Sequence, residues 1–175
     1  MSDLNRISPD EFKASEKMPV VLVLDDVRSA YNVGSIFRTA DAFRIEAIYL
    51  CGISARPPHK DISKTALGAT ESVHWQYFEK VTDAVSGLRQ NGYRVYAVEQ
   101  VDESISLADF TPGTGSGNAF IFGHEVYGVK EALLSLVDGC IEIPQFGTKH
   151  SFNVAISAGI VLWDISNKYS TASKA

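Results

Sequence analysis

Cysteine is scarce in this chain of 175 residues, which contains two cysteines, Cys51 and Cys140. Two thiols cannot build the disulfide scaffold on which many small secreted domains depend. Both fall at the ends of predicted strands. We therefore expect two buried free thiols in a reducing compartment.

Long hydrophobic runs are also missing. The longest run near the start covers residues 20–24, whereas a membrane-spanning helix needs about 20 apolar residues, so this run predicts a buried strand. The first fifteen residues carry several charges and no apolar core of a signal peptide. We expect no secretion, no contact with a membrane and a cytoplasmic protein.

Positive charge is not in excess, because 16 Lys and Arg stand against 21 Asp and Glu, for a net charge of −5. This balance argues against a protein that coats nucleic acid through a generally basic surface. A local patch stays possible, since several basic residues gather in one third of the chain: Arg28, Arg38, Arg44, Arg56, His59, Lys60 and Lys64. The content of 45% apolar and 21% charged residues is typical of one soluble globular domain with a single core.

Three common catalytic patterns are absent as well. The four histidines have no metal-ligand spacing with the cysteines, so we expect no metal site. The chain has no phosphate loop ending in Gly-Lys-Ser/Thr and no Gly-x-Ser-x-Gly nucleophile elbow. Asp25 and Asp26 are adjacent, and on a strand they would point to opposite faces, so they do not predict a pair of carboxylates.

Apolar periodicity predicts strands that alternate with helices. The predicted strands are residues 20–25, 47–51, 73–77, 93–98, 119–122 and 140–143, and the predicted helices are residues 31–43, 61–67, 81–88, 130–137 and 151–167. This alternation predicts one α/β domain with a mainly parallel sheet flanked by helices. Ligands of such sheets bind beyond the carboxyl ends of the strands, which draws attention to residues 25–34, 123–128 and 144–153.

The first of these segments combines an amide, a glycine and an arginine. Asn32 lies at the strand-to-helix turn, Gly34 permits close backbone approach, and Arg38 follows within about two helical turns. A planar guanidinium near a helix start is suited to gripping phosphate. A helix cap with a surface salt bridge would leave the same pattern.

The other two segments are equally open when taken alone. Gly123 and Gly128 flank Glu125 directly after a predicted strand, as an ordinary turn also would. The third segment leads into a helix whose first turn holds Ser151 and Asn153, and capping alone would explain either residue. That helix is rich in small residues, which allow close packing against another chain or against an internal segment.

In order and spacing, the three segments together resemble the three motifs of the SpoU family, also called the TrmH family, of SPOUT RNA methyltransferases. The similar stretches are Asn32-x-Gly34-x-x-x-Arg38, Gly123-x-Glu125-x-x-Gly128, and Ile143-Pro144 through Ser151-Phe152-Asn153-Val154; residues 64–69 also resemble a family segment. The resemblance covers about residues 20–168. His124 stands where a small residue is common in the family, and Phe152 where Leu is usual.

The resemblance implies a fold and a reaction that periodicity does not. It implies a deep trefoil knot in the C-terminal segment, an exception to the rarity of knots, with S-adenosylmethionine bound there. It implies a homodimer that pairs through the C-terminal helix, and methyl transfer to the 2′-hydroxyl of an RNA ribose. It also implies a domain over residues 20–168, with a short N-terminal extension at 1–19 and a flexible tail at 169–175. That extension is too short to be the extra RNA-binding domain of many relatives.

The resemblance also assigns roles to residues. The implied catalytic set is Asn32, Arg38, Glu125, Ser151 and Asn153, and the implied cofactor set is Val98, Gly123, Ile143 and Phe152. For RNA we expect contacts from Arg28, Arg44, Arg56, Lys60 and Lys64. Arg38 is the proposed base by family analogy, although a guanidinium is normally protonated, so a phosphate-binding role stays open.

Transfer RNA is preferred over ribosomal RNA as the substrate, because the chain is compact and carries no recognisable added domain. Two other hypotheses stay open. One is a knotted RNA-binding protein without catalysis, against which the complete catalytic set argues. The other is an unrelated α/β nucleotide-binding enzyme, which would bind a nucleotide and not S-adenosylmethionine.

Overall fold

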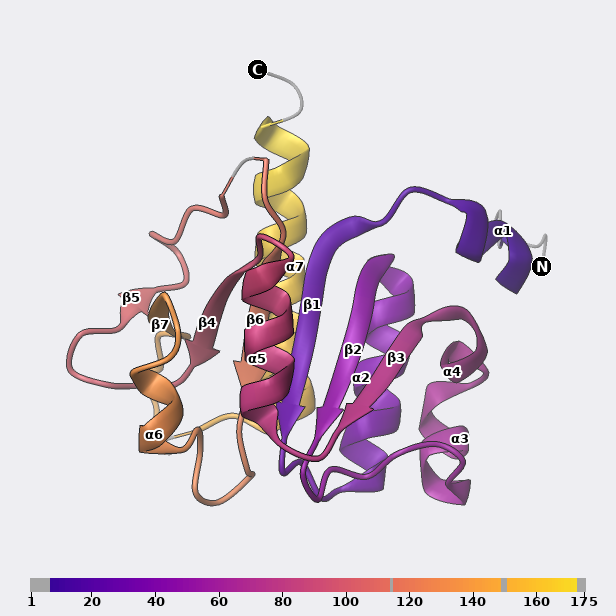
Figure 1. The fold of residues 1–175 in the computed structure, drawn as a ribbon, viewed down its shortest axis with the longest axis horizontal. Coiled ribbons are helices and arrows are strands. Elements are labelled where there is room, and N and C mark those ends of the chain that lie inside the picture. Colours follow the sequence, from indigo (N-terminus) through magenta and orange to yellow (C-terminus); the bar gives the residue numbers. More distant parts are fainter. Residues whose placement is uncertain (1–6, 114, 149–150, 173–175) are drawn as a thin grey trace.

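The computed structural model describes residues 7–113, 115–148 and 151–172 and has a seven-stranded sheet with the order β3-β2-β1-β6-β4-β7-β5 (Figure 1). All paired strands are parallel. The strands are β1 (Met18–Asp25), β2 (Ile45–Cys51), β3 (His74–Phe78), β4 (Arg94–Val98), β5 (Ile105–Ser106), β6 (Asn118–Phe122) and β7 (Gly139–Glu142). The predicted α/β class with a parallel sheet is confirmed.

Helices cover both faces of this sheet. They are α1 (Pro9–Ala14), α2 (Ala30–Ala42), α3 (Lys60–Ala66), α4 (Ala69–Ser72), α5 (Val81–Gln90), α6 (Glu131–Leu134) and α7 (Val154–Ala172). Figure 1 shows α5 and α6 in front of the sheet and α2 and α7 behind it. The fold is therefore a three-layer sandwich.

The continuous apolar run in β1 follows from this layering. Val20, Leu22 and Leu24 belong to the core under α2 and α7, whereas Val21 and Val23 belong to the core under α5. Successive side chains of a strand point to opposite faces, so a central strand covered on both faces is apolar at every position.

Described residues near both ends of the chain form helices and a strand where an extension and a flexible tail were expected. Phe12 of α1 is buried in the core, and β1 begins at Met18. Helix α7 continues to Ala172, past the expected boundary at residue 168, and the buried Asn118 donates a hydrogen bond to the Tyr169 hydroxyl at 2.6 Å. Residues 173–175 of the expected tail lie outside the described residues. A buried amide needs a partner, and this hydrogen bond fixes the C-terminal part of α7 to β6.

Other differences from the sequence-based elements are local. Helix α6 has four residues where residues 130–137 were expected, and α7 begins at Val154, not at residue 151. Cys51 is buried as expected, but Cys140 is only partly buried. None of the described helices is long and apolar enough to cross a membrane. The knot implied for the C-terminal segment stays a prediction.

Candidate functional site

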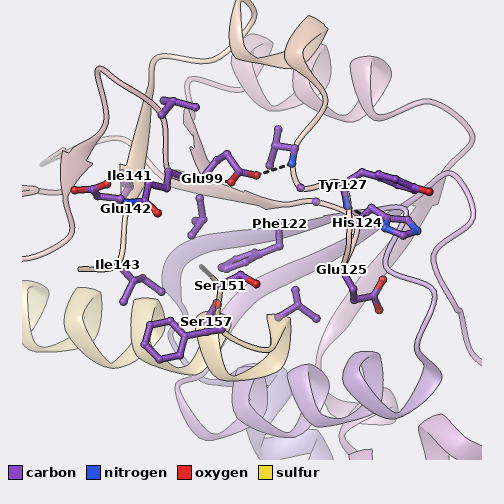
Figure 2. Close-up of a pocket in the computed structure, with 18 of the residues that line it drawn as sticks. Glu99, Phe122, His124, Glu125, Tyr127, Ile141, Glu142, Ile143, Ser151 and Ser157 are labelled. Atoms are coloured by element: carbon purple, nitrogen blue, oxygen red, sulfur yellow. Dashed lines mark hydrogen bonds between the residues drawn. The ribbon is translucent and has the colours of Figure 1, made fainter. Parts of the chain in front are cut away.

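A cavity of about 740 Å³ opens beyond the carboxyl ends of β4, β6 and β7 (Figure 2). Val98, Phe122 and Ile141 supply its apolar wall from these three strands. This volume lies within the range of about 300–1,000 Å³ that is typical of small-molecule sites. The position agrees with the rule for ligands of parallel sheets.

Most of the residues implied for catalysis and cofactor binding lie in the wall of this cavity. They are Val98, Gly123, Glu125, Ile143, Ser151, Phe152 and Asn153. Chain segments far apart in the sequence supply them: the end of β4, the loop after β6, and the segment between β7 and α7. Asn32 is not in the wall but is bonded to two residues that are.

The loop at residues 123–129 forms one side of the cavity and is closed on itself. The His124 and Gly128 backbones exchange two hydrogen bonds of 3.1 and 2.8 Å, and the His124 Nδ1 accepts the N–H of Val126 at 3.0 Å. A Cβ on Gly123 would lie 2.2 Å from the carbonyl carbon and oxygen of Gly128. The close approach within the loop therefore requires glycine at position 123, and the His124 side chain stabilises the turn by accepting a backbone N–H inside it.

Glu99 stabilises the same loop through a hydrogen bond, and the sequence analysis did not identify this residue. Its carboxylate accepts the Val129 N–H at 2.8 Å, and a Cβ on Gly128, where φ is +66°, would lie 2.2 Å from Oε2. Glu99 directly follows β4, so the rule about strand ends could have found it. No glycine motif follows it to draw attention there.

Glu125 reaches out of this loop to the start of α2. Its carboxylate accepts the backbone N–H of Arg28 at 3.3 Å and of Ser29 at 3.1 Å, and the Asn32 side-chain amide at 3.5 Å. Partial burial would raise the pKa of Glu125, but its interaction with its own backbone N–H, together with these hydrogen bonds, outweighs burial and holds the pKa below its ordinary value. Glu125 is thus an ionised anchor at a helix N-terminus, where negative charge is favoured.

Asn153 completes the connection from the third segment. Its Oδ1 accepts the N–H of Ala155 at 2.9 Å, which caps α7, and its Nδ2 donates to Asn32 Oδ1 at 3.0 Å. Because Asn32 donates to Glu125 and accepts from Asn153, its amide has one favourable orientation. The three segments singled out in the sequence are therefore joined by one chain of hydrogen bonds.

Acidic side chains predominate among the described residues of the cavity wall. Four carboxylates line it, from Glu99, Glu125, Glu131 and Glu142, and no lysine or arginine occurs among the described lining residues. A polyphosphate would meet repulsion there, whereas a ligand with positive charge would be stabilised. The cavity therefore fits a cationic ligand with an apolar part.

A charged cluster next to the cavity contradicts the expectation for Asp25 and Asp26. Both carboxylates face Lys130, whose Nζ lies 3.3 Å from Asp25 Oδ2 and 2.6 Å from Asp26 Oδ2. Asp26 has left the strand with φ of +59°, so the alternation of strand side chains no longer applies. Burial raises the pKa of Asp25, and burial beside Asp25 raises the pKa of Cys51 to about 12.

Arg38 lies outside the cavity wall. It is exposed on α2, and its side chain makes no hydrogen bond or ion pair with the described residues. At 1.5 Å rise per residue it lies roughly 9 Å along the helix from Asn32. The structure thus separates Arg38 from Asn32, Glu125 and Asn153, which are joined by hydrogen bonds, and from Ser151, which lies in the cavity wall.

The expected RNA-contacting residues do not form one surface. Arg28 and Arg56 follow the carboxyl ends of β1 and β2, with Arg56 packed 4.0 Å from the centre of the Tyr77 ring, and Lys60 and Lys64 lie on α3. Arg44 precedes β2, and its carbonyl accepts the N–H of Met18 at the start of β1. Arg44 therefore lies at the amino ends of the strands, opposite to Arg28 and Arg56, because α2 carries the chain back from the end of β1 to the start of β2.

Known proteins resemble this chain in sequence and in fold. Residues 19–163 match the model of the SpoU rRNA Methylase family. A 23S rRNA (guanosine-2'-O-)-methyltransferase of Neisseria meningitidis is 29% identical over 144 residues, which cover 82% of this chain and 56% of the relative. A tRNA (guanosine(18)-2'-O)-methyltransferase of Thermus thermophilus is 28% identical over 147 residues, covering 83% of this chain and 73% of the relative. The chain thus spans little more than half of the first relative.

Solved structures agree with these matches. An AdoMet-bound rRNA methyltransferase from Sinorhizobium meliloti superposes with a TM-score of 0.80 at 25% identity, covering 93% of this chain and 61% of that one. A TrmH-family protein from Porphyromonas gingivalis, described as a putative RNA methyltransferase, gives a TM-score of 0.74 at 28% identity, with 83% and 58% covered. The resemblance drawn from the three motifs is confirmed, and the chain belongs to the SpoU rRNA Methylase family.

Proposed function

We propose that this protein transfers a methyl group from S-adenosylmethionine to the ribose 2′-hydroxyl of an RNA nucleotide, with S-adenosylhomocysteine as the leaving thioether and the hydroxyl proton released to solvent. The observation that carries the proposal is the chain of hydrogen bonds from Glu125 through Asn32 to Asn153 at the edge of a carboxylate-lined cavity. The printed activities of the rRNA and tRNA relatives support the same reaction.

The cavity suits this cofactor in shape and charge. Val98, Ile143 and Phe152 offer apolar surface for an adenine, and the carboxylates favour the positive sulfonium. When bound, the cofactor would supply an electrophilic methyl group on a charged sulfur. The AdoMet-bound relative from Sinorhizobium meliloti supports the assignment. The absence of lysine and arginine from the described lining argues against the alternative of a nucleotide-binding enzyme.

The residues of the hydrogen-bonded set act by positioning. Glu125 is ionised and already accepts three hydrogen bonds, so it fixes the start of α2 and does not take a proton. Asn153 and Ser151, both in the cavity wall, hold the acceptor ribose. Holding hydroxyl and methyl carbon in line removes much of the barrier, since alignment of reactants is worth several kcal/mol, on the order of 7–11 in favourable cases.

Arg38 has a separate part in this proposal. A guanidinium stays protonated and is a poor base, and Arg38 is exposed and has no partner among the described side chains. It is suited to bind the phosphate next to the reacting ribose through its planar fork. Its distance along α2 from Asn32 fits a contact to the backbone of the RNA and not to the reacting hydroxyl.

The proposed substrate is a transfer RNA and the proposed location is the cytoplasm. The tRNA (guanosine(18)-2'-O)-methyltransferase of Thermus thermophilus, which is 28% identical to this chain, supports tRNA as the proposed substrate. The free thiols of Cys51 and Cys140 suit a reducing compartment.

The proposed assembly is a homodimer through α7. Ile156 and Trp163 lie on that helix with more than half of their surface exposed, at spacings that put them on one side. Pairing two such surfaces would remove this apolar area from water. Light scattering at micromolar concentration should give twice the 19.1 kDa of one chain, and a mass near 19.1 kDa would reject the dimer.

The proposal is tested by incorporation of tritiated methyl groups into RNA from a strain that lacks this protein. Wild type should label the RNA, and Arg38→Ala should label it far less while calorimetry gives an unchanged affinity for S-adenosylmethionine, because the proposed contact of Arg38 is to the RNA backbone and not to the cofactor. Arg38→Lys should recover little, since an ammonium lacks the planar fork. Cofactor binding without any methyl transfer would instead support a knotted RNA-binding protein without catalysis.

A further inference from the structure

The tip of the 123–129 loop presents an aromatic ring to solvent beside the cavity. Tyr127 is 84% exposed, more than almost any other large apolar side chain of the described residues. Tyr127 also counts among the residues that line the cavity. A side chain that is both in the wall and almost fully exposed stands at the mouth.

This ring is held in place by its surroundings. The turn is closed by two backbone hydrogen bonds between His124 and Gly128, and the His124 Nδ1 accepts the N–H of Tyr127 at 3.4 Å. The His124 and Tyr127 rings are in contact, with centroids 4.8 Å apart and planes tilted by 36°. The closed turn fixes the backbone of Tyr127, and the contact with His124 restricts its ring, which lowers the cost of binding against this ring.

The ring lies at the reactive end of the cavity. Figure 2 shows Tyr127, His124 and Glu125 together at the end opposite Glu142 and Ile143. Glu125 is linked through Asn32 to Asn153, which the proposed function assigns to the acceptor ribose. A base attached to that ribose, or to its neighbour, would therefore come next to Tyr127.

The neighbouring charge favours RNA as the occupant. Arg28, whose backbone N–H donates to Glu125, is exposed, and its side chain makes no hydrogen bond or ion pair with the described residues. Proteins hold single-stranded nucleic acid by pairing its phosphates with cations and stacking its bases on exposed rings, and Arg28, whose backbone meets Glu125 of the same loop, offers such a cation. An apolar protein partner would leave this cation without a counter-charge.

We infer that Tyr127, supported from behind by His124, is a stacking platform for a nucleobase of the RNA substrate. The inference rests on the proposed function for the nature of the ligand. Stacking uses the face of the base, which all four bases have, so this subsite strengthens binding without choosing the base. This subsite is distinct from the proposed cofactor site, which uses the apolar wall at the carboxyl ends of β4, β6 and β7.

The test compares Tyr127→Ala, Tyr127→Phe and Val126→Ala by fluorescence anisotropy with a labelled single-stranded RNA of mixed sequence. Tyr127→Ala should weaken RNA binding by about tenfold, since stacking on one aromatic ring is worth that much or more. Tyr127→Phe keeps the ring and should bind like wild type. Val126→Ala removes an exposed apolar side chain from the same tip and should also bind like wild type.

Calorimetry with S-adenosylmethionine serves as the second measurement. Equal cofactor affinity in wild type and Tyr127→Ala shows that the loop is intact, and the tenfold loss in RNA binding then supports the platform. Equal RNA affinity in both proteins, or no RNA binding by wild type, overturns it. Tritiated-methyl incorporation separates the two proposals: RNA binding that depends on Tyr127 without methyl transfer would keep the platform and reject the proposed activity.

Discussion

Asn153 performs two tasks that a pair of substitutions can separate. Its oxygen caps α7 by accepting the Ala155 N–H, and its amide nitrogen donates to Asn32. Asn153→Ala removes both. Loss of the cap should cost about 1 kcal/mol, and loss of a partly exposed hydrogen bond about 0.5 kcal/mol, so the free energy of unfolding should fall by about 1.5 kcal/mol.

Asn153→Asp keeps the cap and removes only the link to Asn32. A carboxylate accepts the Ala155 N–H, and its charge at a helix N-terminus contributes about 0.5 kcal/mol, which offsets the lost bond. Asn32 cannot restore the link by turning its amide, because its oxygen would then face the ionised Glu125. Stability should therefore change by less than about 0.5 kcal/mol.

Thermal unfolding and methyl transfer together test this separation. For a domain of this size 1 kcal/mol corresponds to about 2–4 °C, so Asn153→Ala should lower Tm by about 3–6 °C and Asn153→Asp by about 1–2 °C at most. Both should lower methyl transfer on the order of tenfold, because both release Asn32. The reasoning fails if Asn153→Asp unfolds like Asn153→Ala, or if it transfers methyl groups at the wild-type rate.

Two further predictions concern the 123–129 loop. Gly123→Ala should lower both Tm and cofactor affinity, because the added Cβ would lie 2.2 Å from the Gly128 backbone. The control is Gly87→Ala on α5, where no atom lies within 4 Å of the added Cβ, and this variant should raise the free energy of unfolding by about 0.5–1 kcal/mol. Equal behaviour of the two variants would contradict the close approach at Gly123. Folding lowers the pKa of Glu125, so the ionised carboxylate stabilises the folded state. This contribution to the free energy of unfolding is complete above the ordinary pKa of 4.5 and is lost as the pH falls through the lower pKa of the folded state. Urea unfolding between pH 3 and 6 should therefore show a smaller acid loss of stability in Glu125→Gln than in wild type, and parallel curves would count against an ionised Glu125.

Local sequence was sufficient for the class of fold. The continuous apolar run in β1 and the helical spacing in α2 report burial that each residue experiences within its own element, so periodicity predicted both. The strand-end rule then selected the segments that hold Asn32, Glu125 and Asn153, because in a parallel sheet all carboxyl ends share one edge. Their order and spacing also carried the resemblance to the family.

Contacts between distant segments could be known only from the tertiary structure. Glu99 holds the Val129 N–H, and Lys130 joins Asp25 with Asp26, across separations that leave no periodic trace in the sequence. Arg44 and Arg28 are close in sequence yet lie at opposite edges of the sheet, because a helix of 13 residues separates them. A sequence pattern indicates which face of its own helix or strand a residue occupies, whereas tertiary packing decides which helices and strands meet. For this reason the motifs could be identified from the sequence, but the contacts among them could not.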